Sequence, residues 1–431
     1  MSIPPPRPLF ARYLPLALSF ELMMLEAPSV QWAIGRLPET QTNLAAWGLT
    51  MQLSLLIESP VIMLLVTATA LVKNTDTFQA LRQFMLRIAL YCTLLTLLTA
   101  FTPLFEFVTI GLLGQPIPVA EAARLPLRLM LLWSAAIAWR RFYQGVLVRQ
   151  GQTSRVTLGT AVRLAFVVIP ALLLTWLKCL SGAATAAVAI MAGVLVEALC
   201  ASAFARPIVR QLPPPNLGDA PLTQKAISRF HTPLALTTVL TLLAQPVTSA
   251  AIARLPFASQ NLAAWPVVFS ALMILRGWGF AVQEITVAQL RQGAPFDAQL
   301  PRFAVKIGVA SSVAALLMAL TPLSTMYASA LGVPSVLHPL VRSGILWGAL
   351  LPLLAALSSC VRGVLVARQK TMAVYWGMAL GLLVQGLLLA AGVVTHQPAV
   401  QTAAIAFTLS GLAETVFLTA RVRQDRSTHQ A

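Results

Sequence analysis

The pentapeptide Asn43-Leu44-Ala45-Ala46-Trp47 recurs unchanged as Asn261-Leu262-Ala263-Ala264-Trp265, 218 residues further along the chain. Other segments repeat at the same offset, and they are widely separated in the sequence. They are Arg36-Leu37-Pro38 with Arg254-Leu255-Pro256, Gly145-Val146-Leu147-Val148 with Gly363-Val364-Leu365-Val366, and Pro28 with Pro246. Matches in one register over such distances indicate an internal duplication, so the chain contains two copies of one structural unit.

The composition indicates that lipid is the solvent of this chain. Of its 431 residues, 58% are hydrophobic and only 10% are charged, and the mean hydropathy is +0.79. A soluble domain carries about 25% charged residues, whereas runs of about 20 apolar residues can cross a bilayer. We therefore expect an all-α polytopic membrane protein with about twelve transmembrane helices. The expected spans are residues 9–33, 42–72, 83–111, 124–149, 156–177, 183–205, 228–252, 259–289, 302–325, 339–366, 373–394 and 399–420.

The repeat divides the predicted helices into two groups of six. Residues 1–205 form the N-terminal repeat and residues 228–420 the C-terminal repeat, and residues 421–431 form a short tail. The polar segment 206–227, which contains three consecutive prolines, is predicted to be a cytoplasmic linker. Because six is even, both repeats enter the membrane from the same side and are parallel.

The net charge of +17 is explained by topology. With both termini in the cytoplasm, 19 basic residues lie on the cytoplasmic side and 4 on the other, as the positive-inside rule requires. We therefore expect a multi-pass protein of the plasma membrane, here a bacterial inner membrane. Its partner is the lipid bilayer, and we expect no nucleic-acid binding.

The sequence lacks common motifs for phosphate binding, metal binding and disulfide formation. The chain has no Gly-rich phosphate loop, no His-Glu-x-x-His and no paired cysteine spacing among its four cysteines. Its four histidines are dispersed. We expect a protein that is not an enzyme and that holds no metal or cofactor.

The first predicted helix carries the sharpest candidate site. Glu26 stands two residues before Pro28, whose missing N–H frees the carbonyl of Met24. A carboxylate beside an unpaired carbonyl suits a coupling proton or sodium ion. Glu21, in the same helix, is a second candidate, although Glu26 could instead be a structural partner. Helix kinks are expected at Pro28, at its repeat counterpart Pro246, and at Pro60.

Further charged residues lie inside the predicted spans, where each costs at least about 2.5 kcal/mol unless it is compensated. Glu58 maps by the offset onto Arg276, which predicts a salt bridge or two facing walls of a central cavity. The pair could act as a gate or as a static link. Glu284 lies eight residues from Arg276 and therefore on nearly the same helix face.

Arginines inside the fourth and tenth spans suggest an anion site. Arg140 and Arg141 lie in the fourth span. Arg362 lies in the tenth, at the position that corresponds to Gln144 at the 218-residue offset. Arginine suits carboxylate and phosphate, but these side chains could also extend to the cytoplasmic surface. We expect Glu197 and Glu414 to pair with arginines such as Arg163 or Arg342, and Asn43 and Asn261 to be N-caps of the helices that follow them.

The chain resembles the superfamily of multidrug and toxic compound extrusion (MATE) transporters and lipid-oligosaccharide flippases. Its first half is similar to bacterial relatives of the progressive ankylosis (ANK) transporter family. The resemblance rests on residues 14–26 with Pro15, on Arg36-Leu37-Pro38, on residues 43–48 and on the Gly145–Val148 run. It implies a two-lobed bundle, alternating access and export. The animal members are associated with efflux of pyrophosphate, nucleotide or citrate, which would suit Arg140, Arg141 and Arg276.

One departure concerns ion coupling. The coupling acids of cation-coupled extruders usually lie in the first or seventh helix, and residues 228–252 contain none, which leaves Glu21 or Glu26. Together these features predict a secondary-active efflux transporter, an antiporter that exports a small solute, with an anion as one candidate class and the substrate itself left open. The alternatives are a flippase for a lipid-linked or amphipathic substrate and a non-transporting membrane scaffold.

Overall fold

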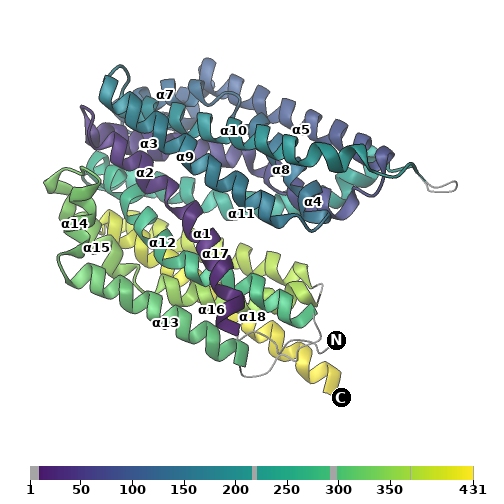
Figure 1. The fold of residues 1–431 in the computed structure, drawn as a ribbon. Helices are drawn as coiled ribbons and strands as arrows, with labels where there is room; N and C mark the ends of the chain where they lie inside the picture. Colours follow the sequence, from purple (N-terminus) through teal and green to yellow (C-terminus); the bar gives the residue numbers. More distant parts are fainter. Residues whose placement is uncertain (1–8, 216–220, 292–298, 369, 431) are drawn as a thin grey trace. The chain divides into compact units, whose positions relative to one another are not determined.

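The computed structural model describes residues 9–215, 221–291, 299–368 and 370–430, and all regular structure within these ranges is helical (Figure 1). The elements are α1 (Leu9–Met24), α2 (Glu26–Ile34), α3 (Thr40–Ile62), α4 (Leu64–Leu71), α5 (Thr75–Phe101), α6 (Leu104–Glu106), η1 (Phe107–Leu112), α7 (Ile117–Leu129), α8 (Trp133–Arg149), α9 (Thr153–Leu177), α10 (Gly182–Arg210), α11 (Gln224–Ala253), α12 (Ala258–Arg291), α13 (Gln299–Leu320), α14 (Leu323–Ala330), η2 (Ser335–Leu337), α15 (His338–Trp347), α16 (Leu351–Ala367), α17 (Thr371–Val394) and α18 (Ala399–Gln430). The expected all-α class is confirmed.

The described residues contain nine helices long and apolar enough to cross a membrane, or ten when the bent pair 335–347 and 351–367 counts as one span. Two of the twelve expected spans are interrupted and fall outside this count. The first, at residues 9–33, is divided at Leu25 into α1 and α2. The second, at residues 124–149, is divided between α7 and α8 at residues 130–132.

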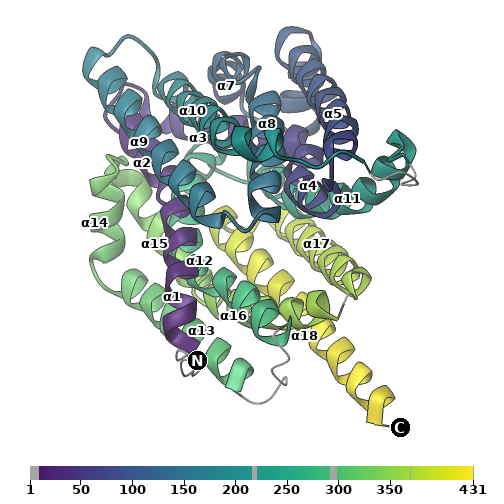
Figure 2. The same ribbon diagram turned by 45° about the vertical axis from the view of Figure 1, so that its right-hand side comes forward.

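The helices pack into two compact units that differ from the two sequence halves. The first unit comprises Ser29–Ala253, and the second comprises Arg254 onward together with the N-terminal segment up to Pro28. Consequently α11 packs on α3, α4 and α5, and α1 packs on α12 (Figure 1, Figure 2). The opening helix of each predicted half therefore belongs to the unit of the other half. The division into two six-helix repeats, with the boundaries given above, therefore remains a prediction.

The backbone reproduces the 218-residue offset inside each unit. Helix α8 runs from Trp133 to Arg149 and α16 from Leu351 to Ala367, so both ends match at this offset. Residues with positive φ also fall at matched positions. They are Glu39 (55°) with Phe257 (58°), Gly114 (67°) with Gly332 (72°), and Lys178 (52°) with His396 (52°). Left-handed backbone is unfavourable for residues other than glycine, so its recurrence shows that both copies fold locally in the same way.

The repeated asparagines do not cap the helices that follow them. The N-cap of α3 is Glu39, and Asn43 lies one turn further in. Its side-chain Nδ2 donates to the carbonyls of Pro38 (3.0 Å) and Glu39 (3.1 Å), and Asn261 makes the equivalent pair of bonds in the second copy. The Oδ1 of Asn43 accepts from the backbone N–H of Ala183 at 3.0 Å, so Asn43 caps the start of α10 instead.

The repeated Gly-Val-Leu-Val segment marks a close contact between helices. A Cβ on Gly145 would lie 2.5 Å from the Cβ of Ala68, and one on Gly363 would lie 2.8 Å from the Cβ of Thr286. Ala68 and Thr286 are themselves 218 residues apart. Only glycine permits this approach without displacement of the neighbouring helix, so the duplicated motif encodes the same packing in both units.

Candidate functional site

The first helix breaks beside its candidate acid. Helix α1 ends at Met24, the residue whose carbonyl Pro28 leaves unpaired, and α2 begins at Glu26 after a single turn residue, Leu25. The interruption at Leu25 lies three residues before Pro28, which is itself part of α2. Because the chain passes from the second unit to the first between Pro28 and Ser29, half-buried Glu26 lies two residues from that crossing.

The corresponding position of the second copy is different. Helix α11 is continuous from Gln224 to Ala253 and passes through Pro246 without interruption. The break of the first helix therefore has no counterpart at Pro246. The physical reason is that α11 packs entirely within the first unit, and its chain crosses between Ala253 and Arg254 only after the helix has ended.

The helix that contains Pro60 is interrupted at Met63, and side chains bond the carbonyls near this break. Helix α3 ends at Ile62 and α4 begins at Leu64. The carbonyl of Leu56, which Pro60 leaves without its helical donor, accepts from the Oγ of Ser59 at 2.7 Å. The carbonyl of Pro60 lies 2.8 Å from the Nε2 of His231, and the Nδ1 of His231 lies 2.9 Å from the Oγ1 of Thr67. Buried His231 therefore links α11 to both sides of this break.

A buried ionic group, which we call the first-unit cluster, occupies the unit of residues 29–253. It consists of Glu58 (α3), Arg140, Arg141 and Gln144 (α8), Thr160 and Arg163 (α9) and Glu197 (α10). Fully buried Glu197 is its centre.

All four bonds to Glu197 come from this cluster. Its Oε2 accepts from Arg140 at 2.5 Å and from Arg163 at 3.4 Å. Its Oε1 accepts from Gln144 at 3.0 Å and from Thr160 at 3.1 Å. The predicted pairing with Arg163 is confirmed. Arg140 is 5% exposed, so it does not extend to the surface.

Glu58 is the second acid of the first-unit cluster. Its side chain is 3% exposed, and its Oε2 has no hydrogen-bond partner among the described residues. The positive charges that act on it are those of Arg140, Arg141 and Arg163. The Nε atoms of Arg140 and Arg141 are likewise buried without a partner in the described part of the chain. With three arginines and two glutamates, the first-unit cluster carries one surplus positive charge.

The second unit holds a smaller ionic group, the second-unit cluster, formed by Arg276 (α12), Arg362 (α16) and Glu414 (α18). The Nε of Arg362 donates to the Oε1 of Glu414 at 2.6 Å. The guanidinium of Arg276 lies 5.3 Å from the ring centre of Phe280 and 3.8 Å from the Sδ of Met273. The charges of Arg362 and Glu414 act on Arg276. Within this cluster two arginines meet one glutamate, before the nearby Glu21 is counted.

Glu21 lies against the helix that carries Arg276. A Cβ at Gly277 would overlap the Oε1 of Glu21, so the absence of a side chain at Gly277 gives this carboxylate its present position. That Oε1 is buried and has no hydrogen-bond partner among the described residues. The hydroxyl of Tyr13 donates to the carbonyl of Trp278 at 2.6 Å and anchors α1 on α12. Helix α1 therefore places Glu21 next to the second-unit cluster.

Three other expectations about charged residues have different outcomes. Glu58 and Arg276 belong to different units, so their salt bridge stays a prediction. Glu284 is exposed on α12. Arg342, predicted as a partner of Glu414, donates to the carbonyl of Ala319 at 2.8 Å. Glu414 pairs with Arg362 instead. Arg342 lies on α15, whereas Arg362 lies on α16, which packs against the α18 that carries Glu414.

Metal binding finds no support in the side chains of the structure. Within the described ranges, no three His, Cys, Asp or Glu side chains lie close enough together to hold a metal ion. The four cysteines are free, and Cys92 and Cys360 are buried.

No family model and no curated protein matches the chain. The solved structure of a multidrug resistance MATE family transporter of the MOP superfamily, in its inward-facing conformation, superimposes with a TM-score of 0.73 over 96% of this chain and 99% of that one. This chain has the fold of a MATE transporter. The identity is 14%, so the likeness concerns the fold alone.

Two further structures share the MATE fold with this chain. The lipid II flippase MurJ, in an inward closed conformation, has a TM-score of 0.69 at 12% identity and covers 94% of this chain and 86% of that one. A MOP superfamily transporter from Pyrococcus furiosus, described by a reverse polarity of its binding pocket, has a TM-score of 0.66 at 14% identity over 95% of each chain. The resemblance to the progressive ankylosis family stays a prediction.

Proposed function

We propose that this protein is a secondary-active membrane transporter that exports a small anionic solute by alternating access. The observation that carries the proposal is that arginines outnumber glutamates in the ionic cluster of each unit, three to two in the first and two to one in the second. An uncompensated charge at membrane depth costs at least about 2.5 kcal/mol. Arginine donates in a planar fork that fits carboxylate and phosphate. In each unit an anionic solute would compensate the cluster, through Arg140 and Arg141 in the first unit and through Arg276 and Arg362 in the second.

The MATE fold supports the transport part of the proposal. MATE family structures similar to this chain include an inward-facing form (TM-score 0.73) and an outward-facing form (TM-score 0.66). In this chain, the two packed units are joined by only two chain crossings. Separate units with few covalent links suit a mechanism in which one unit moves against the other.

We assign the coupling proton or sodium ion to Glu26 and Glu21. Glu26 directly follows the break at which the carbonyl of Met24 loses its helical partner. Glu21 presents a buried carboxylate oxygen without a hydrogen-bond partner in the described chain.

The test is efflux from proteoliposomes loaded with citrate, pyrophosphate, nucleotides and, separately, cationic dyes, under an imposed pH or sodium gradient. Wild type should release anions and retain dyes, and Glu26→Gln should lose the response to the gradient. Glu121→Gln, an exposed acid on α7, is the matched control and should behave as wild type. A Glu26→Gln protein that still responds would overturn the coupling role.

The anion sites are tested in the same vesicles. Arg276→Gln should raise the concentration needed for half-maximal efflux by about tenfold, the value of one lost charge-assisted contact of roughly 1.5 kcal/mol. The exposed Arg206→Gln is the control for the loss of one positive charge. If apolar replacement of Glu26 and Arg276 together left efflux intact, the protein would be a scaffold or would transport by other residues.

A second candidate function is a flippase for a lipid-linked or amphipathic substrate, which the likeness to the MurJ structure favours. A fluorescent lipid pyrophosphate in the same vesicles distinguishes the two. Protein-dependent exposure of the label to an external quencher, without efflux of any soluble anion, would select the flippase. We place the protein in a bacterial inner membrane with both termini in the cytoplasm, on the strength of the charge asymmetry.

A further inference from the structure

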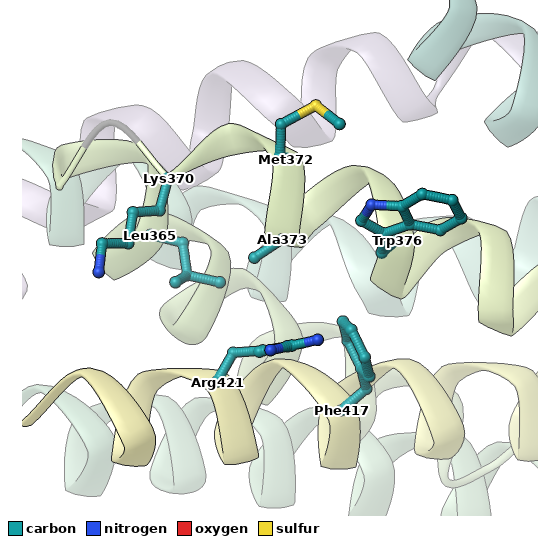
Figure 3. A pocket seen from close by; sticks show the side chains of 7 residues that line it. All are labelled: Leu365, Lys370, Met372, Ala373, Trp376, Phe417 and Arg421. Carbon is teal, nitrogen blue, oxygen red and sulfur yellow. The ribbon is translucent and has the colours of Figure 1, made fainter. Parts of the chain in front are cut away.

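The second unit contains an open groove outside its ionic cluster. Helices α17 and α18 pack together and also contact α16. Near the end of α16 they border a cavity of about 330 Å³ (Figure 3). Its lining is formed by Leu365, Lys370, Met372, Ala373, Trp376, Phe417 and Arg421. A second cavity of about 430 Å³ shares Trp376, Phe417 and Arg421 and extends along α17 to Leu383. Together the two cavities make one groove.

One end of the groove is cationic. Lys370 precedes α17, and Arg421 projects from α18 on the other side of the cavity (Figure 3). The guanidinium of Arg421 lies 5.1 Å from the ring centre of Phe417, which holds it over the groove. None of the described lining residues is acidic. The lining therefore offers an anion two positive charges from two elements and, among its described residues, no carboxylate.

The other end of the groove is apolar and open. Trp376, Leu380 and Leu383 follow one another at helical spacing on α17, so they form one continuous stripe. Trp376 is 56% exposed and Leu383 is 58% exposed. In a membrane such surface faces hydrocarbon, and a tryptophan beside cations is typical of the headgroup level.

We propose that this groove binds one anionic phospholipid. Lys370 and Arg421 hold its phosphate, Trp376 lies at the glycerol level, and an acyl chain follows the stripe to Leu383. The continuity of a cationic end with an exposed apolar stripe selects a phospholipid over free phosphate, which would use only the first part. Basic pockets between membrane helices on the cytoplasmic side bind anionic headgroups. Arg421 lies in the C-terminal part of α18, and the C-terminus is predicted to be cytoplasmic.

The test measures binding of phosphatidylglycerol and of phosphatidylcholine with the same acyl chains to the purified, detergent-solubilised full chain by native mass spectrometry. The wild-type protein should retain phosphatidylglycerol in preference to phosphatidylcholine. Arg421→Gln should weaken it about fivefold, the usual effect of one basic residue at an anionic surface. Arg423→Gln is the matched control, because Arg423 is exposed on the same helix and lies outside the groove lining.

Two further results decide the occupant. Trp376→Ala should weaken both lipids while leaving the phosphatidylglycerol preference intact, and inorganic phosphate in excess should not displace the bound lipid. Displacement by phosphate would mean a site for free anion and would overturn the phospholipid proposal. Equal binding of the two lipids by wild type, or equal loss in Arg421→Gln and Arg423→Gln, would also overturn it. Arg421→Lys, which keeps the charge, should retain binding and thus separates a lost contact from misfolding.

Discussion

Replacement of Glu197 by glutamine should destabilise the first unit more than any other removal of a single charge. The substitution keeps one acceptor oxygen for Gln144 and Thr160 but puts an N–H donor where Oε2 accepts from Arg140 and Arg163. Two bonds to charged groups are lost, each worth about 1.5–3 kcal/mol. Breaking a buried ion pair by removal of one partner costs about 3–5 kcal/mol, because the other charge stays buried. We therefore expect a loss of about 3–5 kcal/mol in the free energy of unfolding.

The assay is denaturant unfolding of the purified protein in one detergent, followed by tryptophan fluorescence. Glu414→Gln is the comparison, because the pair of Glu414 with Arg362 is partly exposed, at 11% and 23% of the side chains. Glu414→Gln should lower the free energy of unfolding clearly less than Glu197→Gln does. A double variant, Glu197→Gln with Arg140→Gln, should recover part of the stability because it removes the stranded charge. A loss below about 0.5 kcal/mol, the range of ordinary surface substitutions, would refute this view of the first-unit cluster, as would strictly additive effects.

Three further expectations concern packing, hydrogen bonding and topology. Gly145→Ala should destabilise by about 1–3 kcal/mol through overpacking, whereas Gly386→Ala, which has nothing within 4 Å of the added Cβ, should be neutral or stabilising in the same unfolding assay. His231→Leu leaves the carbonyl of Pro60 without its donor and should cost about 1–3 kcal/mol, and His231→Gln should recover part of it if the lost bond is the cause. In intact cells, exposed Cys179 should react with a membrane-impermeant maleimide; labelling only after cell lysis would reverse the predicted orientation.

The duplication was the most predictable feature of the fold, because identical local sequences adopt identical local backbone. The offset read from the repeated pentapeptide recurs in the helix ends of α8 and α16 and in the left-handed residues Lys178 and His396. The interruption between α7 and α8 was not predictable. It falls on Met130-Leu131-Leu132, an apolar run without glycine or proline, so tertiary packing and not local sequence must set it.

The exchange of α1 and α11 between the units was also hidden from the sequence. In lipid, an apolar face can meet either a neighbouring helix or an acyl chain, so hydropathy does not encode which bundle a helix joins. The candidate acids and arginines were identified by their depth in apolar segments, which composition does reveal. The ion-pair partners of these residues were harder to predict, because the two copies differ. Glu197 and Glu414 are one residue out of register, and Arg362 stands where the first copy has Gln144. His231 was missed because an isolated histidine in an apolar helix carries no motif.

The asymmetry between the two chain crossings gives the break in the first helix its significance. The crossing after α11 lies at the start of the turn at residues 254–257, outside any helix, and there Phe257 has a φ of 58°. The crossing at Pro28 and Ser29 lies within α2, two residues after Glu26. Any motion of one unit against the other must be absorbed by the backbone at these two links. We propose that motion at the first link also bends the break at Leu25, which Glu26 and Pro28 follow in α2, and so changes the surroundings of Glu26. An ion bound there would therefore be held differently in each conformation, which is the condition for coupling binding to movement.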